Sequence, residues 1–313
     1  YGYRPMKSAH DALRQVRENV LEKDWVVDMD ISKFFDEIDH ELMLKAVDAM
    51  LGEKWVKMYV KRWLEMKVET TDGEVELSRD KGTPQGGVIS PLLANLYLHY
   101  TLDQWLDTHY PTVSFVRYAD DIVLHCKTEE EARQLLISLG ERLTQVKLRV
   151  NEAKTKIVYC KDYRRKGLHD KTQFGFLGFS FQPRVQQSKR EPGTSYTVYA
   201  AEISRANQQK IRGAIRESVN WRNTTMELDI IAARLNRKLR GWINYFGIFG
   251  KRDLRRTLLY LEAKLLKWIR RKHKIGVRAG ILLLHNLRRK HPRKFFHWER
   301  NLCYNLKQIT RAV

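Results

Sequence analysis

The amino-acid sequence predicts an α+β fold over its first two hundred residues and an all-helical part after them. Three observations support this prediction: short apolar runs rich in β-branched residues, longer runs with apolar residues at helical spacing, and a change of charge near residue 200. Residues 1–200 balance Lys plus Arg against Asp plus Glu, whereas residues 201–313 carry the whole formal net charge of +21. A neutral body joined to a strongly basic part predicts that the chain binds a polyanion such as nucleic acid.

Strands and helices alternate in the first part. The run WVVDMDIS predicts the first strand, and KVETTDGEVELS has Asp72-Gly73 between alternating residues, which is typical of a hairpin. In chain order, the further elements expected are helices over 39–50 and 53–66, a loop in KGTPQGG, a long helix over 88–110, two strands around Asp120-Asp121, a helix over 128–145, a strand pair or strand–turn–strand in KLRVNEAKTKIVYC, and a strand pair in QFGFLGFSFQP.

The second part is predicted to be basic amphipathic helices. The boundary is expected near 200–204, after the hairpin-like stretch QPRVQQSKREPGTSYTVYA. Aromatic side chains interleave with the cations, a pattern that suits backbone contact plus base stacking, although for Trp242, Tyr245 and Phe246 a place in the helical core is the favoured interpretation. The helices are expected over 204–219, 225–249, 251–274 and 278–290, and the aromatics are Trp221, Trp242, Tyr245, Phe246 and Trp268.

Composition excludes several classes of protein. Cys126, Cys160 and Cys303 are far apart and form no CxxC pair, so neither a disulfide framework nor a zinc module is expected, and a reducing cytosol fits. No apolar run approaches the roughly 18 residues of a membrane span, and we find no signal peptide. The histidines of the basic part lack a ligand spacing and are interpreted as phosphate-contact or packing residues: His273, His285, His291 and His297.

Two apolar strand segments each carry close-set carboxylates. In SFVRYADDIVLHC, Asp120 and Asp121 stand between apolar runs, and a solvated turn is the simplest alternative. Asp28 and Asp30 are two residues apart in the first strand, so both side chains face the same side. Like charges on apolar strands repel one another unless a cation neutralises them, and carboxylate oxygens suit Mg²⁺. Two such segments favour a metal cluster of the kind that two-metal nucleotidyl transfer requires.

Five segments, in this order, resemble the palm motifs of reverse transcriptases: VVDMDISKFFDEIDH, GTPQGGVISPLLANLYL, FVRYADDIVL, LRVNEAKTKI and FGFLGF. The opening YGYRPMKSAHDAL resembles a fingers motif of the same enzymes. RLNRKLRGWINYFG resembles the thumb, or maturase domain X, of proteins encoded by bacterial group II introns, and HPRKFFHWER resembles the ending of their short members. The resemblance covers nearly the whole chain.

The resemblance implies a right-hand polymerase fold with partial fingers, a palm built on an antiparallel sheet, an α-helical thumb and a basic helical tail. Met6 stands where relatives often have a small residue, the family's earlier N-terminal motifs do not precede residue 1, and no HNH-like endonuclease module is expected. The expected domains are 1–23, part of the fingers; 24–203, the palm with fingers elements; 204–274, the helical thumb; and 275–313, a basic nucleic-acid-binding tail.

The resemblance also assigns roles to residues. Asp30, Asp120 and Asp121 match the catalytic metal-binding triad, which implies two Mg²⁺ ions, while Asp28 has no general counterpart. Phe35 matches a gate against the nucleotide 2′-hydroxyl, with core packing as the alternative, and Lys154 matches a phosphate-facing lysine, with a solvated lysine as the alternative. The remaining nucleotide-binding positions are Arg4 and Gln85, and the primer grip is Phe176, Leu177, Gly178 and Phe179.

The basic helices are expected to follow the phosphates of a nucleic-acid duplex, because their cations recur on successive helical turns. The residues expected to bind nucleic acid are Arg234, Arg237, Lys238, Arg240, Lys251, Arg252, Arg255, Arg256, Arg270, Arg271 and Lys272.

The function implied is that of an RNA-directed DNA polymerase of group II intron type that uses deoxynucleoside triphosphates, binds RNA template or intron RNA and DNA primer or target, and acts in splicing and intron mobility. It would work in the bacterial cytoplasm, at the nucleoid and away from membranes. Two alternatives stay open: a maturase without catalysis, and the same catalytic core in a retron, a diversity-generating element, a CRISPR-associated system or phage defence.

Overall fold

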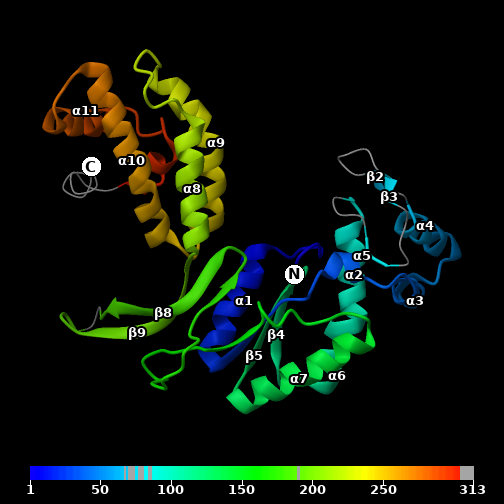
Figure 1. Ribbon diagram of the computed structural model, residues 1–313. Coiled ribbons are helices and arrows are strands. Elements are labelled where there is room, and N and C mark those ends of the chain that lie inside the picture. The colour runs from blue at the N-terminus through cyan, green and yellow to red at the C-terminus, as the bar shows by residue number, and fades with distance from the viewer. Residues whose placement is uncertain (67, 70–74, 77–80, 84–86, 189–190, 304–313) are drawn as a thin grey trace. The chain divides into compact units, whose positions relative to one another are not determined.

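The computed structural model describes residues 1–66, 68–69, 75–76, 81–83, 87–188 and 191–303 (Figure 1). The chain divides into two compact units. The first comprises Tyr1–Leu177 with Phe181–Ala200, and the second comprises Gly178–Ser180 with Ala201–Val313. The chain passes from the first unit to the second for the last time between Ala200 and Ala201, close to the boundary expected at 200–204.

A four-stranded antiparallel sheet forms the centre of the first unit. Its strands are β1 (Trp25–Met29), β4 (Ser114–Tyr118), β5 (Asp121–Cys126) and β6 (Lys156–Tyr159), in the order β4-β5-β1-β6. This arrangement confirms the predicted antiparallel sheet. The segment KLRVNEAKTKIVYC, expected as a strand pair or a strand–turn–strand, has a single bridge between Val150 and Ile31, then a turn, then one strand, β6, which agrees with the second alternative.

The register of β1 against β5 separates the two faces of the sheet. Met29 lies opposite Ile122 and Val27 opposite Leu124, and all four side chains belong to the main hydrophobic core. Because side chains alternate along a strand, Asp28 faces the other side. Helix α7 (Glu129–Gln145) contributes to the core face, whereas α1 (Ala9–Glu22) contacts β4 and β5 (Figure 1).

Further helices complete the core of the first unit. Asp39 caps α3 by accepting a hydrogen bond from the Leu42 amide, and Gly52 ends it in the left-handed region at φ 66°. The helix predicted over 88–110 is interrupted by one π-helical turn. The elements are α2 (Phe34–Glu37), α3 (His40–Leu51), α4 (Lys54–Leu64), α5 (Ser90–Leu98), the π-helix η1 (His99–Asp103) and α6 (Gln104–His109).

Two smaller sheets accompany the central one. Strands β2 (Val68–Glu69) and β3 (Val75–Glu76) pair antiparallel as expected of a hairpin, and the Asp72-Gly73 turn lies outside the described residues. Strands β7 (Phe174–Phe176), β8 (Phe179–Gln187) and β9 (Ser195–Ile203) form a three-stranded sheet in that order. The strand pair predicted in QFGFLGFSFQP is thus β7 and β8.

The second unit is helical. Ser204 caps its first helix by accepting a hydrogen bond from the Asn207 amide, and leucines such as Leu239 and Leu265 form a core between the helices. Residues 275–303, expected as a separate tail, pack in the same unit, with α11 on α10 and α12 on α9. The helices are α8 (Arg205–Ser218), α9 (Leu228–Phe246), α10 (Lys251–His273), α11 (Val277–Lys290) and α12 (Phe296–Glu299).

The aromatic side chains of this unit mostly face inward. Trp221 is buried and its Nε1 donates to the Ile215 carbonyl at 3.1 Å, while the buried Trp268 donates to the Asn223 carbonyl at 3.0 Å. Phe246 is also buried, whereas Trp242 and Tyr245 are half-buried. The stacking interpretation was therefore wrong for Trp221 and Trp268, which serve the helical core, whereas the burial of Phe246 agrees with the core position favoured for it.

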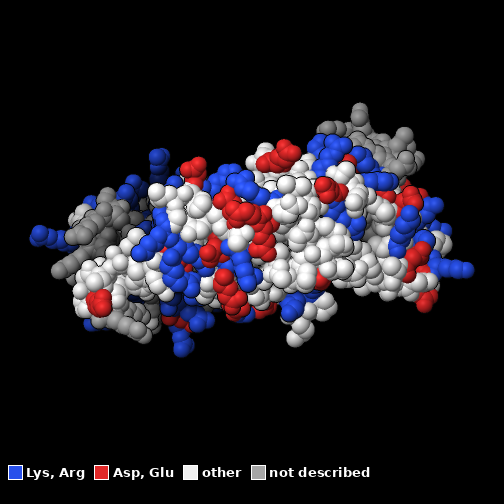
Figure 2. Space-filling model, turned by 90° about the horizontal axis from the view of Figure 1, so that it is seen from below, with Lys and Arg blue, Asp and Glu red and all other residues white. Residues whose placement is uncertain are grey.

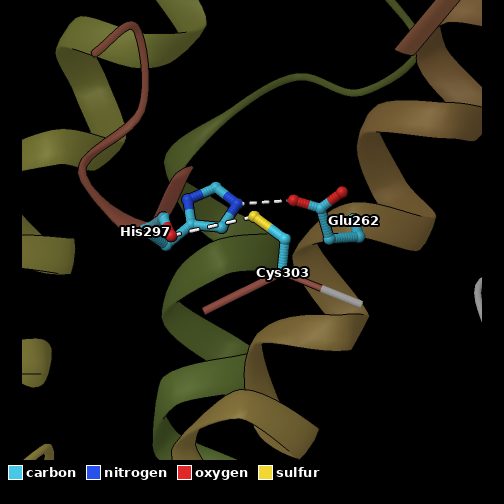
Figure 3. Close-up of side chains that lie close together, drawn as sticks. All are labelled: Glu262, His297 and Cys303. Carbon is cyan, nitrogen blue, oxygen red and sulfur yellow. Dashed lines mark hydrogen bonds and ion pairs between the residues drawn. The ribbon is translucent and has the colours of Figure 1, made fainter. Parts of the chain in front are cut away.

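A buried carboxylate ties the last two helices to α10 (Figure 3). Glu262 has no exposed surface, and its Oε1 lies 2.6 Å from His297 Nε2 and accepts from Trp298 Nε1 at 2.8 Å. Its Oε2 accepts from Arg288 Nη2 at 2.5 Å. Burial alone would raise the pKa of Glu262, but the hydrogen bond and charge of His297, followed by the Arg288 charge, outweigh burial and lower it. Helices α10, α11 and α12 therefore meet at one ionised side chain.

Substitution Glu262→Gln is expected to destabilise the protein by about 3–5 kcal/mol, because it leaves Arg288 without its buried counter-charge. Urea unfolding followed by tryptophan fluorescence measures this loss. Since the pKa of Glu262 is lowered in the folded protein, its contribution is present above the unfolded pKa near 4.5 and is lost as the pH falls through the folded value. Glu299→Gln on the exposed face of α12 is the control, and equal midpoints for the two variants would contradict the network.

His125 on β5 is a second buried titratable group. It has no exposed surface, and neither ring nitrogen has a hydrogen-bond partner within the described part of the chain. Burial, followed by the charge of Lys23, lowers the pKa of His125 from 6.5 to about 3. Below pH 6.5 the unfolded chain therefore takes up a proton that the folded chain does not.

His125→Leu is expected to flatten the acid side of the stability profile. The wild type should lose about 1.4 kcal/mol per pH unit below pH 6.5 at this site, or about 2 kcal/mol at pH 5. Urea midpoints at pH 8 and pH 5 measure the difference, with exposed His109→Leu as the control. A variant with the same pH dependence as the wild type would show that His125 is protonated in the folded state.

Candidate active site

The paired aspartates stand at the turn between β4 and β5. Tyr118 pairs with Asp121, so Ala119 and Asp120 form a two-residue turn. Ala119 has φ 55°, in the left-handed region that non-glycine residues rarely occupy. Asp120 and Asp121 are both exposed to solvent, while Ile122, directly after them, is buried in the core. The core residues on either side hold this turn at the edge of the sheet.

Strand β1 brings Asp30 to the same edge. Because Met29 lies opposite Ile122 in an antiparallel pair, the next residue, Asp30, extends the register to Asp121. The backbone of Asp30 is held on its other side, where its carbonyl accepts from the Asn151 amide at 2.8 Å and its amide donates to Thr155 Oγ1 at 3.2 Å. The structure thus places the three predicted metal-binding aspartates at neighbouring strand ends.

The carboxylates act on one another electrostatically. The pKa of Asp121 is raised from 3.8 to about 6, first because the surrounding protein desolvates it and then because Asp120, Asp28 and Asp30 are negative. This desolvation occurs although Asp121 is accessible to water. Burial also raises the pKa of Asp28, against the opposing charge of Lys156, whose Nζ lies 3.4 Å from Asp28 Oδ2. The negative charges of Asp28, Asp30 and Asp120 therefore all act on Asp121.

This donor set fits a divalent cation. Hard carboxylate oxygens gathered at one edge, with one pKa raised by desolvation and by neighbouring negative charges, are what a hard metal ion neutralises. Asp30, Asp120 and Asp121 would hold the ion, and Lys156 already compensates Asp28.

In the part of the chain that the structure describes, the compact group of possible metal ligands lies elsewhere, at Glu262, His297 and Cys303 (Figure 3). Their ligand atoms all lie within 4.8 Å of one another. Both Glu262 oxygens already accept hydrogen bonds, and burial raises the pKa of the Cys303 thiol to about 12, so the thiolate that a metal needs is disfavoured. We interpret this group as structural.

The predicted nucleotide-binding residues have different surroundings. Lys154 is exposed and its Nζ lies 3.5 Å from Asp30 Oδ2, beside the carboxylates. Phe35 is half-buried against the core, with its ring 5.3 Å from that of Phe34, which is compatible with both interpretations of this residue. Arg4 donates to Asp103 Oδ2 at 2.6 Å. Gln85 lies outside the described residues.

The expected primer grip is a tight turn with buried flanks. Phe176 and Phe179 are buried, and Leu177 and Gly178 form the turn at φ 47° and 80°. A Cβ on Gly178 would lie 2.7 Å from Asn207 Nδ2, which donates to the Gly178 carbonyl at 3.0 Å, so only glycine fits here. Contact with a strand would therefore be made by the turn rather than by the two phenylalanine rings.

Most of the predicted nucleic-acid-binding cations are exposed. Lys272 is an exception, since its Nζ donates to the Met226 carbonyl at 2.8 Å and lies over the Trp268 ring, and Arg270 is also half-buried. On the face of the molecule that Figure 2 shows, basic and acidic side chains are interspersed, so this face presents no surface of one sign. The exposed candidates are Arg234, Arg237, Lys238, Arg240, Lys251, Arg252, Arg255, Arg256 and Arg271.

Sequence reasoning missed three polar residues behind the aspartate turn: Asn95, Asp103 and Arg117. All three are buried and hydrogen-bonded to one another through the Arg117 guanidinium. A signal was available, because each stands inside an apolar run, ANLYL, YTLDQW and SFVRYA, where an unpaired charge or amide would be unfavourable.

Two other observations concern the described residues. Cys126, Cys160 and Cys303 are free thiols. Among the helices in the described ranges, none has the length and apolar character needed to cross a bilayer.

Comparison with known proteins places this geometry in a family. Residues 1–181 match the family model "Reverse transcriptase (RNA-dependent DNA polymerase)", and residues 208–283 match "Group II intron, maturase-specific domain". The chain is 31% identical to protein YkfC of Escherichia coli over 52% of each chain. It is 24% identical to the group II intron-encoded protein LtrA of Lactococcus lactis, over 88% of this chain and 57% of LtrA.

The chain thus spans about half the length of these relatives. Among solved structures, telomerase from Candida albicans with a TWJ fragment of telomeric RNA aligns with a TM-score of 0.48 and 12% identity, over 97% of this chain and 54% of the telomerase. The family matches agree with the order of motifs along the chain and with the carboxylates at the strand ends. The chain therefore belongs to the reverse transcriptase family and carries the maturase-specific domain of group II intron proteins.

Proposed function

We propose that the chain is an RNA-directed DNA polymerase of group II intron type, which extends the 3′ end of a primer with deoxynucleoside triphosphates. The observation that carries the proposal is the register of β1 and β5, which sets Asp30, Asp120 and Asp121 at neighbouring strand ends. Membership of the reverse transcriptase family supports it.

The three aspartates would hold two Mg²⁺ ions. When bound, the ions supply Lewis acidity at the attacking 3′-hydroxyl and at the leaving pyrophosphate. The protein's part is to keep the three carboxylates at a fixed spacing on a rigid sheet, so that the reacting groups meet without further reorganisation.

Other side chains near this edge would act on the nucleotide. Lys154, whose Nζ lies 3.5 Å from Asp30 Oδ2, would donate a proton to the leaving pyrophosphate. The half-buried Phe35 would exclude a 2′-hydroxyl, Arg4 would face the triphosphate, and Gln85 would contact the incoming nucleotide. The turn at Leu177 and Gly178 would contact the primer strand through its backbone.

The helical unit would bind RNA. Exposed cations on α9 and α10 can follow a phosphate backbone, and the match of residues 208–283 to the maturase-specific domain supports intron RNA as the ligand. The protein would thus act both in copying and in splicing of an intron, in the bacterial cytoplasm at the nucleoid. The same exposed cations favour the second candidate, a maturase that stabilises intron RNA without polymerising.

Primer extension on an RNA template tests the proposal. Wild type should make full-length cDNA in the presence of Mg²⁺, and Asp120→Ala should lower the rate by about 10³-fold or more, because a metal ligand is lost. Asp107→Ala, an exposed aspartate on α6, is the matched control and should extend normally.

Equal cDNA synthesis by Asp120→Ala and wild type would refute the assignment of the metal site. If wild type stimulates splicing of an intron RNA and incorporates no nucleotide on either RNA or DNA templates, the second candidate is the correct one.

Asp121→Asn should separate activity from stability. Removing one of several repelling carboxylates should abolish extension while raising the free energy of unfolding in chelator by about 1 kcal/mol, after allowing for solvent screening at this exposed side chain. The sign follows from the raised pKa of Asp121: its charged form is less favourable in the folded chain than in the unfolded one. Unfolding midpoints at pH 8 measure the effect, and a destabilised variant would contradict it.

A further inference from the structure

A buried ion pair lies directly behind the aspartate turn. Arg117 Nε donates to Asp103 Oδ1 at 2.7 Å and Nη2 donates to Oδ2 at 2.5 Å, so the guanidinium and the carboxylate meet as two forks. Arg117 is 3% exposed and Asp103 is 5% exposed. Buried charges with this geometry define one orientation, because any displacement leaves a charge uncompensated.

The same guanidinium also contacts the turn. Arg117 Nη1 donates to the Ala119 carbonyl at 3.0 Å and to Asn95 Oδ1 at 2.7 Å. The Ala119 carbonyl belongs to the peptide that leads into Asp120, so this hydrogen bond orients the plane of that peptide. Ala119 itself is held at φ 55°, a conformation that costs of the order of 1–3 kcal/mol and persists only where the surroundings impose it. The hydrogen bond from Arg117 to the Ala119 carbonyl is one contact that holds this turn.

The π-helical turn places Asp103. Asn95 lies on α5 and Asp103 ends η1, and both turn their side chains to the same guanidinium. A π turn adds one residue to a helical turn and rotates the residues after it relative to a continuous α-helix, which is why such turns recur at functional sites. The interruption of the long helix thus ends at the residue whose carboxylate accepts both hydrogen bonds from Arg117.

Asp103 has a second basic partner from the opening segment. Arg4 Nη2 lies 2.6 Å from Asp103 Oδ2, and the Arg4 side chain is 44% exposed. Asp103 is therefore shared between an arginine that holds the aspartate turn and an arginine expected to face the nucleotide.

We propose that Arg117 and Asp103 are positioning residues for the polymerase reaction, with Arg117 fixing the turn that carries Asp120 and Asp103 holding both Arg117 and Arg4. This inference rests on the proposed function. It assigns separable effects: Arg117 acts on the spacing of the carboxylates alone, whereas Asp103 acts on that spacing and on capture of the nucleotide phosphates.

Steady-state primer extension with Arg117→Lys and Asp103→Asn tests this division. Lysine keeps the charge but cannot reach Asp103, Asn95 and the Ala119 carbonyl together, so kcat should fall about 10²-fold while the KM for nucleotide changes less than about two-fold. Asp103→Asn should lower kcat similarly and also raise KM several-fold. Arg133→Lys, whose parent arginine pairs with Glu129 on the surface of α7, is the matched control and should change neither.

Binding of Mn²⁺ in the absence of primer and nucleotide gives a second readout, measured by electron paramagnetic resonance. Arg117→Lys should weaken Mn²⁺ binding several-fold, because Asp120 is displaced, and Arg133→Lys should not. Circular dichroism establishes which variants are folded. If Arg117→Lys is not, Asn95→Ala, which removes one acceptor from the same Nη1, takes its place with the same expected pattern.

A folded Arg117→Lys protein with wild-type kcat and wild-type Mn²⁺ affinity would overturn the inference, as would an Asp103→Asn protein whose KM is unchanged. A wild type that binds Mn²⁺ but extends no primer would instead refute the proposed function, and the Mn²⁺ comparison would still decide whether Arg117 positions the turn.

Discussion

The crowding of Asp28, Asp30, Asp120 and Asp121 at one edge of the sheet is the constraint that the first unit must accommodate. The pKa of Asp121 is raised first by desolvation and then by the negative charges of Asp120, Asp28 and Asp30, so without a cation the charged carboxylates favour any distortion that exposes or separates them. The folded protein opposes this distortion because the strands and the turn that carry the carboxylates are held in place. Strand β1 is paired on both sides, its alternate residues are buried in the core, and a buried ion pair holds the turn from behind. The hydrophobic core thus keeps the strands that carry these carboxylates in place.

The sequence predicted this edge well because its evidence is local and redundant. Asp28 and Asp30 in an apolar strand, and YADD between apolar runs, are each readable within a dozen residues, and a family resemblance in motif order connects them. What could not be predicted depends on side chains distant in the sequence. The π turn at His99–Asp103 leaves no mark in a continuous apolar helical pattern, and the link between Asp103 and Arg117 spans two elements. Trp221 and Trp268 were misassigned because interleaving with cations looks the same for an inward-facing and an outward-facing ring.

Arginine has two opposite uses in this chain, and composition cannot distinguish them. Arg117 and Arg288 are largely buried and satisfy carboxylates inside each unit, whereas Arg234 and Arg256 are exposed on helices. The net charge of +21 therefore overstates the surface available to a polyanion. Lys272 shows the intermediate case, since a residue from a run of three cations, Arg270 to Lys272, turns inward and donates to the Met226 carbonyl.

The division of the chain into units has a consequence for modularity. Gly178–Ser180 belong to the helical unit although they lie more than twenty residues before its main segment, and Phe179 packs there against Tyr245, Phe246 and Phe249. The two units therefore do not follow one another as two continuous segments of the chain. A gene fragment that starts at residue 201 would encode every long helix of the second unit yet lack one ring of its core, and a shuffled or transplanted helical module would have to bring that strand of the neighbouring sheet with it. Recombination that separates the two parts is thus penalised by packing, so they are expected to be inherited together.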